Sequence, residues 1–156
     1  MVINSPTARS PVAQPPVTVT VTPTEAPPTS AGPSPSTAAA TVTKNDIRMP
    51  DRFNLLLSDD PIKLYEGYGG DLSYYSSSGL ASKQGKLVRL EAGHAGSRQE
   101  CEADTRFTDT VENAKLIKGS KICILSSDHV GLVTIRAAPE TRDGSHFVTF
   151  DIIVWP

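Results

Sequence analysis

A sharp change in composition near Lys44 most constrains what this chain of 156 residues can fold into. Residues 1–44 hold nine of the 13 prolines, 14 serines and threonines and seven alanines, but no aromatic residue and no leucine. A segment without large side chains cannot bury enough apolar surface to offset roughly 1–2 kcal/mol of backbone entropy per residue. We therefore expect residues 1–44 to be a disordered Pro/Thr/Ser/Ala-rich stalk or linker, which its prolines keep extended.

Residues 47–156 have the composition of a globular domain. All nine aromatic residues and both cysteines lie there, and about 110 residues are enough to bury one core. The formal net charge of the chain is -2, and no run of Lys and Arg resembles a phosphate-tracking patch, so we predict no nucleic-acid partner. No apolar stretch approaches the ~18 residues of a membrane span, so membrane attachment would need a missing upstream anchor.

The stalk also bears on the compartment. Thr/Pro/Ala tracts are typical of extracytoplasmic stalks, with a generic interdomain linker as the alternative. The residues after Met1 have no basic region followed by an apolar one, so they are not a signal peptide. Either an upstream part is missing or the protein is cytosolic, and we expect the former. Beside such a stalk an even cysteine count predicts a disulfide between Cys101 and Cys123, with two buried thiols as the alternative.

Short β-branched segments separated by turn residues predict an all-β fold, a small antiparallel β-sandwich or barrel. We expect strands at 53–57, 62–65, 72–75, 86–90, 121–125, 130–137 and 146–155. The last three are joined by short connections, with a turn expected at 139–145, so they should form a C-terminal three-stranded meander. Residues 96–118 fit a short helix and an irregular crossover equally well.

The last strand carries the clearest pattern. Four apolar side chains alternate onto one face: Val148, Phe150, Ile152 and Val154. We expect this face to lie in the core and the strand to pair with residues 130–137. The other face is also partly apolar, which indicates a central strand.

Several motifs resemble a known family. They are Cys101, the run Gly119-Ser-Lys-Ile-Cys-Ile-Leu-Ser-Ser, the run Val130-Gly-Leu-Val-Thr-Ile, and the terminal run Phe147-Val-Thr-Phe-Asp-Ile-Ile-Val-Trp. Together they are similar to a C-terminal extracytoplasmic β-domain of actinobacterial stalked membrane or secreted proteins, a domain of unknown function. Some of these proteins are receptor-type serine/threonine kinases, in which a Pro/Thr-rich stalk leads to the domain. The resemblance covers roughly residues 62–156 and implies a fold and a cell-surface or secreted location, but no activity.

The tyrosines are the candidate binding residues. All four lie within 11 residues of one another: Tyr65, Tyr68, Tyr74 and Tyr75. Tyrosine combines a broad apolar face with a hydroxyl, which suits recognition of a protein or a glycan, although ordinary packing in the sandwich is the simpler explanation. Because neighbours in a strand face opposite sides, we expect at least one of Tyr74 and Tyr75 to face solvent.

Catalytic and metal patterns are weak. Ser126-Ser-Asp-His129 contains the residue types of a triad, but it is hairpin-turn chemistry, and neighbours in a turn seldom point at one another with triad geometry. Asp59, Asp60, Glu66 and Asp71 could gather around Ca²⁺, but their spacing does not match an EF-hand loop. We therefore predict no catalytic residue, no metal and no cofactor.

These observations favour a non-catalytic extracytoplasmic sensor or binding module that a flexible stalk presents to an unknown protein or glycan. A structural module without its own ligand is one alternative. The resemblance adds another, the C-terminal extracellular part of a serine/threonine protein kinase, in which case the parent protein would be an enzyme although this chain is not.

Overall fold

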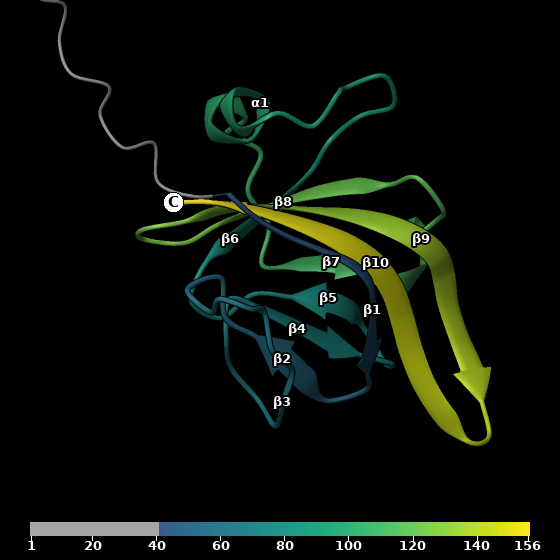
Figure 1. The fold of residues 1–156 in the computed structure, drawn as a ribbon. Coiled ribbons are helices and arrows are strands. Elements are labelled where there is room, and N and C mark those ends of the chain that lie inside the picture. The colour runs from purple at the N-terminus through teal and green to yellow at the C-terminus, as the bar shows by residue number, and fades with distance from the viewer. Residues whose placement is uncertain (1–40) are drawn as a thin grey trace, which may run out of the picture. The chain divides into compact units, whose positions relative to one another are not determined.

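The structure, a computed structural model, describes residues 41–156, which form two packed antiparallel sheets (Figure 1). The elements are β1 (Val42–Pro50), β2 (Phe53–Leu55), β3 (Tyr65–Glu66), β4 (Leu72–Tyr75), β5 (Gly79–Ala81), β6 (Lys86–Arg89), α1 (Arg98–Ala103), β7 (Thr110–Glu112), a 3₁₀ turn (Asn113–Lys115), β8 (Lys121–Leu125), β9 (Val130–Arg142) and β10 (Ser145–Trp155). The predicted all-β sandwich is confirmed. The disorder predicted for residues 1–40 lies outside the described residues.

The first sheet has the strand order β1-β10-β9-β8-β6, so the predicted meander of β8, β9 and β10 is confirmed. β9 does not end at Ala137 as expected but runs to Arg142, because the β9–β10 turn is only Asp143-Gly144. Both turn residues have positive φ, +53° and +76°. That backbone matches the twist of a tight hairpin, and Asp-Gly adopts it readily. The longer turn predicted at 139–145 is therefore wrong.

β10 is an interior strand of this sheet, with β1 on one side and β9 on the other, as its two apolar faces predicted. Val148, Phe150, Ile152 and Val154 are all buried, with at most 1% of their surface exposed. On one side Phe150 lies opposite Ile135 of β9, which confirms the predicted pairing with residues 130–137.

The other neighbour of β10 is β1, which the sequence did not indicate. β1 begins at Val42, opposite Val154, and Lys44 lies opposite Ile152. The disorder predicted through Lys44 is therefore wrong for residues 42–44. Their composition is that of the stalk, but they are ordered by a partner strand more than 100 positions away, and no local pattern reports such a partner.

Asp151 interrupts the apolar outer face of β10, and its carboxylate binds groups at the edge of the sheet. The β1–β10 register shifts between Lys44 and Ile47, and Asp46 adopts a φ of +52° there. The Asp46 amide donates to Asp151 Oδ1 at 2.9 Å, and Arg136 Nε lies 3.0 Å from Asp151 Oδ2. An irregular, charged edge of this kind discourages pairing with another chain.

The second sheet has the order β3-β2-β4-β5-β7 and short strands. β2 ends at Leu55 and β3 starts only at Tyr65, so the strands predicted at 53–57 and 62–65 are shorter than expected. Leu57 and Ile62 are nevertheless buried, because the loop between β2 and β3 packs into the core.

β5 and β7 were not predicted. A side chain at Gly79, the first residue of β5, would place its Cβ 2.1 Å from the Val111 carbonyl oxygen of β7. Glycine is therefore required by the close approach of the two strands, whereas in the sequence Gly79 follows three serines and predicts only a turn.

Two apolar clusters flank the first sheet. The larger lies between the sheets and includes the inward side chains of β10. The smaller lies on the opposite face, under α1 (Figure 1), and consists of Val88, Leu90, Cys101, Cys123, Val130 and Leu132. Of the two alternatives for residues 96–118, a short helix is therefore the one observed, and it covers the outer face of the sheet.

Replacement of Phe150 by alanine should destabilise the domain by about 3–5 kcal/mol, because it removes a fully buried ring and leaves a cavity. A total stability of about 5–15 kcal/mol would leave this variant close to unfolding at 37 °C. Urea denaturation measures the loss. Thr149→Ala, on the half-buried opposite face, is the control and should cost less than about 1 kcal/mol. A loss below about 1 kcal/mol for Phe150→Ala would contradict its buried position.

Candidate functional site

The structure separates the four predicted binding tyrosines. Tyr74 is 1% exposed and belongs to the core between the sheets. Burial, with a smaller contribution from the charge of Asp51, raises the pKa of its hydroxyl. The inclusion of Tyr74 in a binding face is therefore corrected: in β4 it points inward, and its neighbour Tyr75 is the outward-facing member of the pair.

Tyr68 and Tyr75 form a stack on the outer side of the second sheet. Their ring centroids lie 5.7 Å apart with an angle of 19° between the planes. Tyr68 is 67% exposed, and Lys83 Nζ lies 5.6 Å from the centre of its ring. We call these three residues the tyrosine face. Tyr65, 40% exposed on β3, makes no ring contact with the stack among the described residues.

Hydrogen bonds from side chains of the second sheet hold the loop that carries Tyr68 in place over β4. Ser73 Oγ donates to the Gly69 carbonyl, and Asn54 Nδ2 donates to the Gly67 carbonyl at 3.1 Å. Gly67 and Gly69 have φ angles of +112° and +130°, a backbone conformation that glycine adopts without strain. The two glycines therefore turn the loop back so that the Tyr68 ring rests on Tyr75.

The predicted bridge between Cys101 and Cys123 is present, with a Cα–Cα distance of 5.4 Å. Both cysteines are fully buried, and the bond joins α1 to β8. Disulfides persist in oxidising environments, so the bond indicates such an environment for this domain.

Glu100 organises the loop before α1. Its carboxylate accepts from the Ser97 and Gly96 amides, each at 2.7 Å, while Ser97 Oγ accepts from the Glu100 amide in a capping box. His94 Nδ1 lies 3.2 Å from Glu100 Oε1. The hydrogen bond from the Ser97 amide is the largest of the effects that lower the pKa of Glu100 to about 2.

The residues weighed for catalysis and for metal binding have structural positions. Ser126-Ser-Asp-His129 forms the β8–β9 turn, in which the Ser126 amide donates to the His129 carbonyl at 3.0 Å. The buried Asp71 carboxylate accepts from the Leu57 amide at 2.7 Å and so holds a loop in place. Within residues 41–156, no three His, Cys, Asp or Glu side chains lie close enough together to bind a metal ion.

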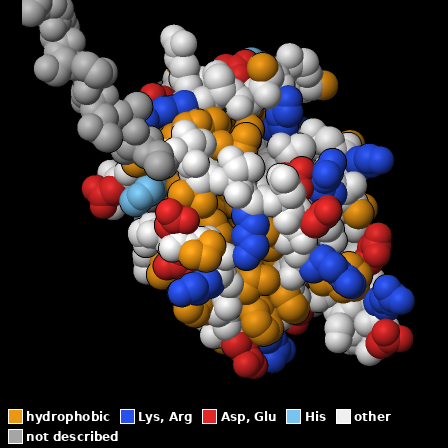
Figure 2. Space-filling view, viewed as in Figure 1, with side chains coloured by type: hydrophobic (Ala, Val, Ile, Leu, Met, Phe, Trp, Pro, Cys, Tyr) orange, Lys and Arg blue, Asp and Glu red, His pale blue; other side chains and the backbone are white. Residues whose placement is uncertain are grey.

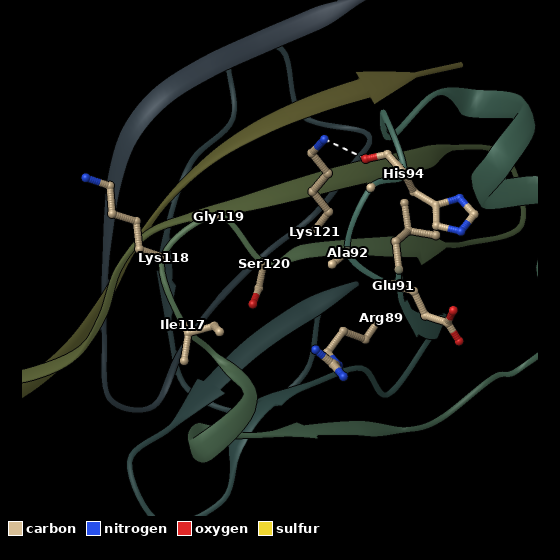
Figure 3. A pocket seen from close by; sticks show the side chains of 11 residues that line it. Arg89, Glu91, Ala92, His94, Ile117, Lys118, Gly119, Ser120 and Lys121 are labelled. Atoms are coloured by element: carbon tan, nitrogen blue, oxygen red, sulfur yellow. Dashed lines mark hydrogen bonds between the residues drawn. The ribbon is translucent and has the colours of Figure 1, made fainter.

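A cleft that the sequence did not reveal lies where β6 and β8 diverge (Figure 3). We call it the fork cleft; its volume is about 290 Å³, and residues 89–94 and 117–121 line it. Lys121 Nζ donates to the His94 and Ala95 carbonyls, each at 2.8 Å, and so ties the two sides together. Figure 3 shows the Arg89 guanidinium and the Ser120 hydroxyl directed toward the same space, with Ile117 beside it and Lys118 extending away from it.

The sequence feature that points to this cleft is a charged residue on the inward side of a strand. In β6, Leu87 and Arg89 share one side, and Leu87 is fully buried in the main core. Arg89 lies opposite the buried Ile122 of β8, yet it is exposed. The alternation that puts Leu87 in the core also puts Arg89 on the inward side, but β6 ends at Arg89, which leaves the guanidinium in an open cleft.

Removal of the disulfide by the double substitution Cys101→Ala and Cys123→Ala should lower the free energy of unfolding by about 3 kcal/mol, the value expected for a loop of this length. Urea denaturation of the variant and of the reduced wild-type protein should give similar losses. Amide exchange should accelerate in residues 91–107, which the bond anchors, more than in β10. A double variant within about 1 kcal/mol of the oxidised protein would contradict this role.

Acid should destabilise the oxidised domain partly through Glu100. Because its pKa in the folded protein, about 2, lies below the ordinary 4.5, the stability that it contributes is complete above pH 4.5 and is lost as the pH falls toward 2. Glu100→Gln should therefore flatten the dependence of the melting temperature on pH between 5 and 2. Asp104, whose pKa Arg106 also lowers to about 2, would leave a residual slope.

Glu102→Gln is the control for this measurement, because that carboxylate of α1 accepts from the Arg98 side chain and not from the backbone of the loop. An unchanged pH profile in Glu100→Gln would show that ionisation of the Glu100 carboxyl does not stabilise the fold.

Known proteins offer no template for these surfaces. Comparisons with protein-family models, with curated proteins and with solved structures found no match to this chain. The helices of residues 41–156 include none that is both long and apolar enough to span a membrane. The tyrosine face and the fork cleft are the two surfaces whose chemistry bears on function.

Proposed function

We propose that this domain is a non-catalytic, extracytoplasmic sensor or binding module whose tyrosine face recognises a protein or glycan ligand. The observation that carries the proposal is the stack of Tyr68 on Tyr75, since it exposes two-thirds of a large aromatic ring that is already held in position. Aromatic side chains that are held rigidly before binding lose little conformational entropy on contact, which is why they are common in recognition surfaces.

The location outside the cytoplasm rests on three supports. The disulfide requires an oxidising environment, the composition of residues 1–44 is that of a stalk, and the motifs at 119–155 resemble an extracytoplasmic domain of actinobacterial proteins. On the same grounds we propose that the parent protein is a stalked membrane or secreted protein. Receptor-type serine/threonine kinases are one class of such proteins.

A structural module without a ligand is the alternative. It would explain the sandwich and the disulfide equally well. It would not explain why Tyr68 is stacked on Tyr75, because Tyr68 lies in a loop and belongs to neither apolar cluster.

Tyr68→Ala should weaken ligand binding by about tenfold while it lowers the stability of the domain by less than about 1 kcal/mol. The test is a glycan array and an array of extracellular proteins, each probed with the oxidised full chain and with the variant. Phe107→Ala is the matched control, because Phe107 is another exposed aromatic residue with a cation, Lys86, over its ring. If the wild-type chain binds nothing on either array, or if both variants bind alike, the tyrosine face is not the recognition surface.

A further inference from the structure

A second surface, which shares no residue with the tyrosine face, carries a different chemistry. The fork cleft and an adjoining cleft of about 180 Å³ share Arg89. Together the two clefts are lined by one carboxylate, that of Glu91. Five cationic side chains line them as well: Arg89, Arg106, Lys115, Lys118 and Lys121. Residues 41–156 hold 14 Lys and Arg against 16 Asp and Glu, and on the face seen in Figure 2 the two signs are interspersed. The paired clefts are thus a positive region on a slightly negative domain.

Only two of these cations are available to a ligand. Arg106 and Lys115 form ion pairs with carboxylates, and Lys121 donates to two backbone carbonyls. Arg89 and Lys118 have no carboxylate within ion-pair distance among the described residues, and both are exposed. Arg89 is the last residue of the inward-facing row of β6, so its guanidinium lies beyond the core and is open to both clefts.

The groups around Arg89 specify more than an anion. The guanidinium can only donate, and its fork matches a carboxylate. Ser120 Oγ already donates its proton to the Lys115 carbonyl at 3.1 Å, so toward the cleft it can only accept. Ile117, 59% exposed, adds an apolar surface. A ligand complementary to these groups combines an anion that fits the guanidinium fork, such as a carboxylate, with a neighbouring hydroxyl donor and a patch of C–H groups.

We propose that the fork cleft binds a carboxylate-bearing sugar unit of an acidic glycan. Arg89 pairs with the carboxylate, Ser120 accepts from a ring hydroxyl, Ile117 contacts the C–H face of the ring, and Lys118 adds positive charge at the rim. The cleft, at about 290 Å³, is near the lower limit of small-ligand sites. The adjoining cleft beyond Arg89 allows the chain of sugars to continue.

Two other anionic ligands fit less well. An acidic peptide would gain most by adding as a strand to β6, but the Leu87 amide and carbonyl are both bonded to Thr108, at 2.9 and 2.8 Å. Inorganic phosphate could pair with Arg89 but would leave Ile117 without a partner. These ligands are outcomes of the experiment.

The experiment is a titration of the ¹⁵N-labelled, oxidised full chain, followed by amide chemical shifts. The probes are trigalacturonate, the neutral trisaccharide maltotriose, pentaglutamate and inorganic phosphate. Trigalacturonate should shift the amides of residues 89–94 and 117–121, and its affinity should fall as salt is added because the contact is ionic. Maltotriose should not bind. Absence of trigalacturonate shifts in these segments, or equal affinity for pentaglutamate or phosphate, would overturn the proposal.

Arg89→Gln should reduce the affinity for trigalacturonate about tenfold or more, the usual effect of losing a charge-assisted hydrogen bond. Arg98→Gln on α1 makes the same change of charge outside the clefts and should bind as the wild type does. Ser120→Ala provides a second variant in case Arg89→Gln does not fold, and should lower affinity several-fold. Wild-type affinity in a folded Arg89→Gln or in Ser120→Ala would reject the assignment of that residue and with it the proposed site.

Discussion

The pairing of β10 on both of its sides holds this domain together. Its inward side chains fill the main core, and its backbone bonds to β9 over nearly its full length and to β1 on the other side. An interior strand has its backbone polar groups satisfied by its neighbours, and its faces can be apolar where other elements cover them. β10 positions β1 through its backbone hydrogen bonds and the second sheet through its inward side chains.

The two apolar faces of the first sheet explain why a mostly β domain carries a helix. The second sheet covers one face, and the other would be left in water beside β8 and β9. The α1 segment covers it, but a helix of six residues is too short to be stable by itself. The disulfide and the capping box around Glu100 supply the missing restraint, and the buried Cys101 serves both as the anchor and as part of the small apolar cluster.

Both candidate surfaces lie where regular structure ends. The tyrosine face is set by a glycine-containing loop folded over β4, and the fork cleft opens where β6 and β8 stop pairing. Rigid strands position such segments while leaving their side chains free to contact ligands. The two surfaces differ in chemistry, one aromatic and the other cationic, so each can be altered without changing the other.

The sequence by itself determined the all-β class, the C-terminal meander, the inward face of β10 and the disulfide. Each of these depends on the alternation of apolar residues, on short turns or on the number of cysteines, all of which can be read from the sequence. Tertiary structure alone decided that residues 42–44 form a strand, that Gly79 begins β5, that Tyr74 is buried while Tyr68 stacks on Tyr75, and that Arg89 opens into a cleft. All four depend on contacts between segments distant in the chain, and local residue preferences carry no record of such partners.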